Sequence, residues 1–247
     1  STLLATGGAG RLHLEGAPTS NHFGATGDGL VLAYRAGVPL RDIDSFQYHP
    51  TGLAWPKHLE GALISEAART AGARLRNGHG HRFVEELAPR DVVASAILRE
   101  LAEGRGVRRD GAQGVFLDTP ELEQRQPGVL AQRLVTLSHL AARAGVDPRA
   151  EPLLVRPTLH YQNGGVAIDA NGATCVPGLW CAGELVGGIH GRNRLMGNAL
   201  LELVVFGRRA GHQAALGATA RPRSAGLAHL AAWERALMGA GLPLDVR

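Results

Sequence analysis

The sequence predicts an α+β fold, and two kinds of segment lead to this prediction. Short apolar runs that stop at glycines, as in residues 1–10, indicate strands that end in tight turns. Longer segments, such as residues 200–206, carry apolar side chains at helical spacing. The chain has 247 residues, 45% of them hydrophobic, and 34 glycines, so it can bury one large core or two smaller ones.

Composition and charge exclude several classes of partner. The formal net charge is +4, but aromatic residues make up only 4% and no block of Lys and Arg stands out, so no nucleic-acid face is predicted. The basic balance suits a small acidic substrate or is simply surface charge. The longest apolar run contains Glu202, so no direct membrane insertion is expected. Two cysteines are too few for a zinc or iron–sulfur set, and no metal site is predicted.

The first 46 residues contain two glycine-rich turns. Gly8-Ala-Gly10 begins like a dinucleotide-binding fingerprint, but the third glycine and the later acidic residue are missing. Residues 26–37 indicate a Gly-Asp-Gly turn followed by a helix with Leu30 and Ala33 on one side. Asp28 precedes the apolar run, so it is predicted to be the N-cap of this helix.

Residues 44–52 alternate like a strand that breaks at proline, and a lone histidine such as His49 is more often structural than functional there. The next candidates are Ser65 and Glu66. An ordinary helix with a surface glutamate explains Ser65 well. It explains Glu66 less well, because the apolar flanks indicate burial, where an unpaired carboxylate is costly.

A proline break precedes a helix predicted over residues 92–101. Arg90 lies in its first turn, where the helix dipole disfavours a cation, whereas Asp91 is the expected anion. A structural ion pair with Glu66 or Asp91 is the alternative to a functional arginine. Beyond this helix, residues 115–118 indicate a strand, and residues 121–125 and 130–144 indicate helices.

The last third of the chain carries two further polar candidates and a glycine-rich turn. Glu184 ends a buried strand, and an exposed strand-end carboxylate explains it as well as a functional one does. Residues 187–211 indicate a turn that feeds a helix. Its free N–H groups, with Arg192 and Arg194, suit an anion or an electron-rich ring edge, although such turns often serve only the backbone.

Several segments, in the same order and at plausible spacing, resemble the succinate dehydrogenase and fumarate reductase flavoprotein family, which also includes L-aspartate oxidase. The resemblance covers roughly residues 1–212. It implies that the cofactor is FAD. The segments that carry it are Ala5-Thr-Gly-Gly8, Thr26-Gly-Asp-Gly29, His49-Pro-Thr-Gly52, Ser65-Glu-Ala-Ala-Arg69, Arg90-Asp91, His160-Tyr-Gln-Asn-Gly-Gly165, Gly183-Glu184 and His190-Gly-Arg-Asn-Arg-Leu-Met-Gly-Asn-Ala-Leu200.

By this resemblance, an α/β FAD-binding domain is interrupted by an α+β capping domain. Residues 1–46 and 158–213 are expected to form the two parts of an incomplete FAD-binding domain, with the capping domain at residues 47–157. Residues 214–247 would begin a helical C-terminal region. The family's pyrophosphate-binding glycine unit is expected in a preceding part of a longer protein, so this chain alone is expected to bind FAD weakly.

The resemblance also implies roles for individual residues. The substrate-binding set would be His49, Ser65, His160 and Arg194. Arg90 would donate a proton, which requires a relay because a free guanidinium scarcely ionises below a pH of about 12, and Glu66 is the candidate partner. The residues expected at FAD are Gly7, Gly8, Asp28, Glu184, Ala199 and Leu200.

The implied function is interconversion of succinate and fumarate, or of a related dicarboxylate, by hydride transfer at the flavin. L-aspartate oxidase is an alternative, although Met196-Gly-Asn-Ala-Leu200 is nearer the respiratory pattern. A non-catalytic domain remnant that binds no flavin alone is the alternative from another class. An iron–sulfur or other electron-transfer subunit is a possible partner. The expected location is cytoplasmic, or peripheral on the inner face of the membrane through partners.

Overall fold

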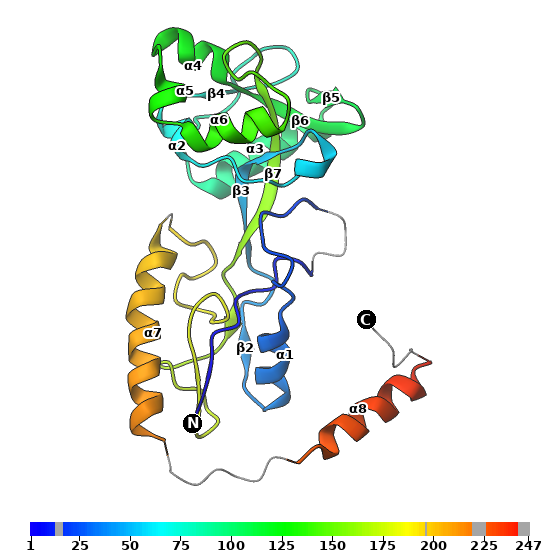
Figure 1. The fold of residues 1–247 in the computed structure, drawn as a ribbon, viewed down its shortest axis with the longest axis vertical. Coiled ribbons are helices and arrows are strands. Elements are labelled where there is room, and N and C mark those ends of the chain that lie inside the picture. The colour runs from blue at the N-terminus through cyan, green and yellow to red at the C-terminus, as the bar shows by residue number, and fades with distance from the viewer. Residues whose placement is uncertain (13–16, 196, 219–225, 242–247) are drawn as a thin grey trace.

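Two long antiparallel strands connect the two units of the molecule. The computed structural model describes all residues except 13–16, 196, 219–225 and 242–247. Strand β3 (Phe46–Leu53) pairs with strand β7 (Leu153–Gln162), and both run from the lower into the upper unit of Figure 1. The register of this pair shifts twice along its length. Segments that lie more than a hundred residues apart in the sequence therefore meet where the two units join.

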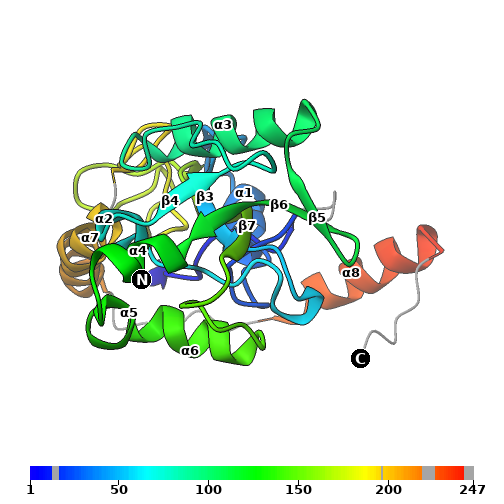
Figure 2. The same ribbon diagram turned by 90° about the horizontal axis from the view of Figure 1, so that it is seen from above.

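The upper unit contains a sheet in the order β3-β7-β6-β4, with β5 added beside β6. Figure 2 shows helix α3 on one side of this sheet and helices α5 and α6 on the other. A buried hydrophobic cluster between these layers runs from Leu53 to Val155. The remaining elements are α2 (Ala67–Thr70), β4 (Arg74–Arg76), α3 (Arg90–Ala102), β5 (Val107–Arg109), β6 (Ala112–Asp118), α4 (Thr119–Arg125), α5 (Val129–Gln132) and α6 (Val135–Arg143), with a 3-10 turn at Lys57–Leu59.

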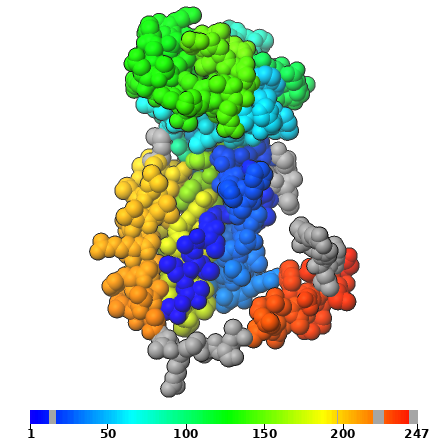
Figure 3. Space-filling model, in the orientation of Figure 1, coloured from blue at the N-terminus to red at the C-terminus, as the bar shows by residue number. Residues whose placement is uncertain are grey.

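The lower unit is built from sequence on both sides of the upper one. Strand β1 (Thr2–Leu4) pairs in parallel with β9 (Leu179–Cys181), and β2 (Leu40–Arg41) pairs with β8 (Gly165–Val166). Helix α1 (Asp28–Arg35) packs near β8, and helix α7 (Asn198–Leu216) packs on β1 and β9. The space-filling view shows this unit, in blue, yellow and gold, below the green and cyan upper unit (Figure 3).

A second hydrophobic cluster lies in the lower unit, with members from Ala9 to Val38 and from Val166 to Val186. The insertion of one cluster inside the sequence of the other agrees with an α+β fold, whereas the exact domain boundaries stay a prediction. Helix α8 (Ala228–Gly239) in the C-terminal tail buries none of its residues, and Arg35 stacks on Trp233 at 4.7 Å. Parts of the tail, residues 219–225 and 242–247, lie outside the described residues.

Two details differ from the sequence predictions. Asp28 is the first residue of α1 rather than its N-cap, because Gly27 takes the cap position with a left-handed φ of 74°. The helix predicted over residues 130–144 is broken into α5 and α6 at Leu134. There the hydroxyl of Ser138 donates to the carbonyl oxygens of Leu130 and Leu134, which satisfies backbone groups at the break.

Candidate functional site

Two histidines lie side by side on the paired strands β3 and β7. The ring centroids of His49 and His160 are 5.4 Å apart, with the planes tilted by 66°. His49 is 1% exposed, and its Nδ1 lies 3.3 Å from the N–H of Thr51, which donates to it. The Oγ of Ser20 lies 2.9 Å from Nδ1 of His160. The strand pairing thus brings together two residues that are far apart in sequence and that were both predicted as site residues.

Two arginines meet at one neutral oxygen beside these histidines. Arg90, at the start of α3, donates from Nη1 to Oε1 of Gln47 at 3.0 Å, and Arg194 donates from Nη2 to the same atom at 3.1 Å. The amide nitrogen of Gln47 in turn donates to the carbonyl oxygen of Arg194 at 2.7 Å and to Oδ1 of Asn193 at 3.0 Å. Gln47 therefore orients both guanidinium groups without neutralising either.

A single carboxylate balances part of this positive charge. Oε2 of Glu66 accepts from Nε of Arg90 at 3.2 Å and forms an ion pair with Nη2 of Arg69, also at 3.2 Å. Glu66 is thus partly buried and paired, as its apolar flanks indicated, and it contacts the arginine that was predicted to be its partner. Because one carboxylate faces two guanidinium groups and Arg194 lies nearby, the cluster keeps an excess of positive charge.

The same environment holds both histidines in the neutral form. Burial lowers the pKa of His49 to about 2, and the positive charge of Arg90 acts in the same direction. Burial, followed by Arg90 and Arg194, lowers the pKa of His160 to about 4. Both rings are therefore uncharged near neutral pH, and each carries one N–H donor and one acceptor nitrogen.

The charge and the donors of this cluster suit a small dianion. Arg90 and Arg194 supply planar forks that match carboxylate oxygens, and neutral imidazoles add single donors. Burial and the nearby Arg90 lower the pKa of Arg194, which is the sign expected where cations crowd together with too few anions. The described part of the chain also leaves the buried Nε of Arg194 without a hydrogen-bond partner. The arrangement can bind two carboxylates and polarise one of them.

Ser65 has a different environment from the other predicted substrate-binding residues. Its side chain is exposed, and its Oγ accepts the backbone N–H of Ala67 at 3.3 Å near the start of α2. This local contact is the one expected of an ordinary helix start. Its role as a carboxylate donor stays a prediction.

A cavity of about 350 Å³ lies in the lower unit and collects three of the residues predicted to bind FAD, which are Gly7, Glu184 and Ala199. Tyr161 forms part of its wall. A Cβ at Gly8 would lie 2.6 Å from Oε1 of Glu184, so only glycine fits beside this carboxylate. Small residues with a few polar groups are what the close approach of a flat ring and its side chain requires, and the residues present fit one part of FAD.

The remaining predicted cofactor residues are placed less directly. Glu184 accepts the backbone N–H of Gln162 at 2.9 Å, and burial raises its pKa. Asp28 is exposed and accepts from the hydroxyl of Thr26 at 2.7 Å. Leu200 is 72% exposed on α7 and does not line the 350 Å³ cavity, unlike its neighbour Ala199. Contacts of Asp28 and Leu200 with the cofactor stay predictions.

Sequence reasoning missed several residues that the structure places in this region. Gln47 joins the two arginines, and Tyr161, His190 and Glu202 form a hydrogen-bonded group behind Arg194. The available signal was weak: Gln47 is a polar residue in a strand that is otherwise buried, and Glu202 interrupts an apolar helical run. Arg192, in contrast, pairs with Asp42 and Asp44 at the surface.

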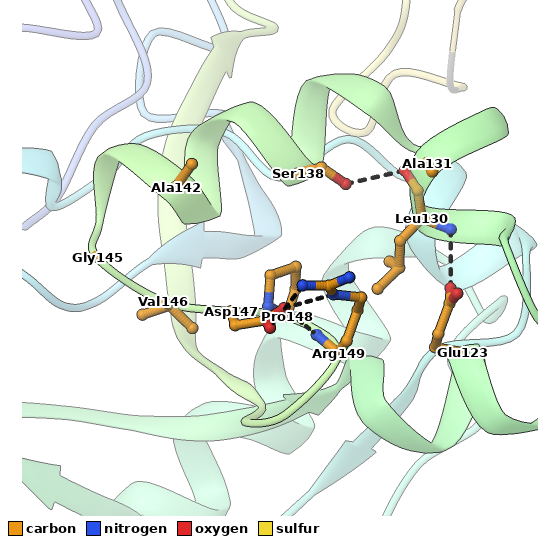
Figure 4. A pocket seen from close by; sticks show the side chains of 10 residues that line it. All are labelled: Glu123, Leu130, Ala131, Ser138, Ala142, Gly145, Val146, Asp147, Pro148 and Arg149. Carbon is orange, nitrogen blue, oxygen red and sulfur yellow. Dashed lines mark hydrogen bonds and ion pairs between the residues drawn. The ribbon is translucent and has the colours of Figure 1, made fainter.

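The largest cavity lies elsewhere, in the upper unit, with a volume of about 550 Å³ (Figure 4). Its polar groups already bind neighbours in the same wall. Glu123 accepts from the N–H groups of Gly128 and Leu130, and Arg149 forms a two-point ion pair with Asp147. This cavity therefore offers no free charged group, and the arginine and histidine cluster is the better candidate site.

Membrane-spanning helices and metal clusters are both missing from the described residues. Within the described ranges, none of the helices has the length and apolar character that crossing a membrane needs. The same ranges contain no group of three or more His, Cys, Asp or Glu placed to hold a metal ion.

Comparison with known proteins identifies the family. A family model described as "FAD binding domain" matches residues 1–200. The chain belongs to this family. The flavin-domain relative from the CoM/CoB fumarate reductase of Methanothermobacter marburgensis is 44% identical over 229 residues, which cover 90% of this chain and 40% of the relative. L-aspartate oxidase of Agrobacterium fabrum is also 44% identical, over 214 residues that cover 84% of this chain and 38% of the relative.

Solved structures agree with the sequence relatives. A quinol-fumarate reductase with menaquinol molecules is 38% identical with a TM-score of 0.83, covering 96% of this chain and 44% of that one. The predicted resemblance to the succinate dehydrogenase and fumarate reductase flavoproteins is confirmed, as is FAD as the cofactor of the family. The chain spans about two fifths of the length of these relatives.

Proposed function

We propose that this chain supplies the dicarboxylate-binding part of an FAD-dependent oxidoreductase that interconverts succinate and fumarate. The observation that carries the proposal is the meeting of Arg90 and Arg194 at the neutral oxygen of Gln47, beside two uncharged histidines. A C4 dicarboxylate has an anion at each end and two reacting carbons between them. Such a substrate needs two separated anchors that leave its centre free.

In this proposal, Arg194, His49 and His160 hold the two carboxylates, with Ser65 as a further donor. Their hydrogen bonds orient the substrate and withdraw charge from one carboxylate as negative charge develops next to it. Bound FAD supplies the group that accepts or donates hydride. The chain's own residues provide the positioning and the electrostatic stabilisation.

Arg90 is the proposed proton donor to the carbon opposite the hydride. Its guanidinium scarcely ionises alone, so the proton must be replaced by a neighbour. Glu66, 3.2 Å from Nε of Arg90, is placed to return it, and the carboxylate lies at the edge of the buried cluster with 16% of its side chain exposed. The pair can therefore pass a proton from the protein surface toward the substrate.

Gly7, Gly8, Glu184 and Ala199 are the residues that we expect against the flavin. Three of them line the 350 Å³ cavity and Gly8 lies against Glu184, and this cavity shares Tyr161 with the arginine cluster. A hydride can pass only if the flavin and the substrate lie close together, and a shared wall between the two sites meets this requirement. An iron–sulfur or other electron-transfer subunit is the proposed partner, because relatives include flavoprotein subunits of fumarate reductases and a quinol-fumarate reductase.

L-aspartate oxidase is the second candidate, because a relative of that name is as similar as the fumarate reductase one. Aspartate has the same two carboxylates, so the anchors alone cannot separate the two activities. The test is to assay the complete protein that contains this chain with fumarate plus a reduced dye, and with aspartate plus oxygen. Faster fumarate reduction supports the first proposal and faster aspartate oxidation the second. Absence of both would indicate a domain that is not catalytic.

A further inference from the structure

Three side chains form a hydrogen-bonded group directly behind Arg194. Oε2 of Glu202 accepts from the hydroxyl of Tyr161 at 3.0 Å and lies 3.1 Å from Nε2 of His190. The rings of Tyr161 and His190 are 5.8 Å apart in an edge-to-face arrangement. Both donors therefore depend on one carboxylate oxygen for their position.

Glu202 is buried to an unusual degree for its element. Helix α7 has 19 residues, and within it only Glu202 and Ala210 are buried, whereas Leu200, Leu201 and Val204 remain well exposed. The Oε1 atom of Glu202 is buried without a partner among the described residues. A buried carboxylate that is only half satisfied is unfavourable for stability, which indicates that it serves another purpose.

The group is connected to Arg194 through an aromatic ring. The guanidinium carbon of Arg194 lies 4.2 Å from the centroid of the Tyr161 ring, which supports the plane of the fork from one side. At the end of the same guanidinium, Nη2 of Arg194 donates to Gln47. The ring of Tyr161 can support this plane only while its own orientation is fixed, and its hydroxyl is fixed by Glu202.

We propose that Glu202 is a positioning residue for dicarboxylate binding, which acts through Tyr161 on the guanidinium plane of Arg194. The inference rests on the proposed function, since it concerns the same binding site. Glu202 touches neither the substrate nor the reacting atoms, and His190 holds the carboxylate in place from its other side. Loss of the carboxylate leaves the Tyr161 ring free to turn, and the two-point fork of Arg194 loses its alignment.

The test uses the complete FAD-loaded protein and three variants: Glu202→Gln, Tyr161→Phe and the double variant. Tyr161→Phe keeps the ring but removes the hydroxyl that donates to Glu202. The dissociation constant of succinate is measured by titrating the flavin absorption spectrum, and the Michaelis constant and turnover number for fumarate are measured separately. Glu234→Gln, on the exposed helix α8, is the matched control. The thermal unfolding midpoint is recorded for every variant.

We expect each single variant to raise the dissociation constant and the Michaelis constant about threefold to tenfold, with turnover within about twofold of wild type. In the Tyr161→Phe background, Glu202→Gln should add less than about twofold, because the path through the hydroxyl is already broken. A general loss of structure would instead lower the unfolding midpoint and turnover together.

Several results would overturn the inference. One is an unchanged dissociation constant in both single variants of a wild type that binds succinate. Another is an effect of Glu202→Gln that is equally large with and without the Tyr161 hydroxyl. If Glu202→Gln does not fold, Tyr161→Phe alone decides, and unchanged binding in it is contrary to the proposal. A wild type that binds no dicarboxylate refutes the proposed function itself, and the inference with it.

Discussion

Arg90 and Arg194 donate to the same atom, Oε1 of Gln47, at 3.0 and 3.1 Å. They come from opposite units of the molecule, one at the start of α3 and the other in the turn before α7. Two like charges at this separation repel each other, and the neutral amide oxygen compensates only in part. A bound carboxylate between them would remove this repulsion, so the free site stores part of the affinity for an anion.

Arg194→Lys should weaken dicarboxylate binding roughly tenfold to a hundredfold. A point ammonium cannot reproduce the fork, and each charged hydrogen bond contributes about 1.5–3 kcal/mol. Titration of the flavin spectrum of the complete protein with succinate measures the change. Arg192→Lys is the control, since Arg192 forms exposed ion pairs with Asp42 and Asp44 and should retain wild-type binding. Equal effects of the two substitutions would count against a direct role for Arg194.

Arg90→Gln should abolish fumarate reduction while leaving succinate binding to oxidised flavin nearly intact. The expected reason is that Arg90 acts on a proton in the transition state, whereas Arg194 and the histidines hold the substrate. Arg99→Gln, on the exposed side of the same helix, is the control. Turnover within about tenfold of wild type, a change of roughly 1.4 kcal/mol in the barrier, would remove Arg90 from the mechanism.

The ligand-free protein should lose stability as the pH falls from about 6.5 toward 4. The pKa of His160 is lowered to about 4 in the folded state, so between these values only the unfolded chain takes up the proton. The unfolding free energy therefore falls with falling pH, and His49, with a pKa of about 2, extends the effect. Denaturant unfolding at several pH values should show a shallower pH dependence for His160→Gln.

The exposed His58 supplies the control for this measurement, because His58→Gln should leave the slope unchanged. The slope and not the absolute stability is the relevant quantity, since replacing a buried ring changes stability at every pH. An unaltered slope in His160→Gln would mean that the histidine is charged in the folded protein.

Gly164→Ala should destabilise the fold and loosen the position of Arg194. A Cβ at Gly164 would lie 1.8 Å from the backbone oxygen of Asp42, so a backbone shift is unavoidable, at a cost of roughly 1–3 kcal/mol. The preceding residue, Asn163, accepts the N–H of Arg194 and would move with it. Gly211→Ala, in open space on α7, should be neutral or stabilising by up to about 1 kcal/mol. Thermal unfolding of the two variants measures the difference.

The sequence predicted helices and turns better than it predicted polar contacts. The helix that starts near Arg90 is confirmed because proline, dipole and apolar spacing all mark its start. The N-cap at Asp28 was wrong because a left-handed glycine is an equally good cap, and no local signal separates the two. The break between α5 and α6 depends on a serine hydroxyl that satisfies carbonyl groups only in three dimensions.

The candidate site shows the same division. His49, His160, Arg90 and Arg194 were named by family motifs, and the structure brings them into one cluster, although their roles stay proposals. Gln47 lies only two residues from His49, but its contact with both arginines depends on the pairing of β3 with β7 and on where α3 starts. Such contacts join segments more than forty residues apart, and periodicity and spacing carry no information about them.

The most direct test compares the binding of succinate and butyrate to the complete FAD-loaded protein by flavin absorption titration. The two ligands have the same four-carbon chain and differ by one carboxylate. If Arg90 and Arg194 form a site for a dianion, succinate should saturate at one equivalent and bind at least about a hundredfold more tightly, the worth of one or two charged hydrogen bonds. Equal affinity for the two ligands, or no saturable change with succinate, would contradict a dicarboxylate site.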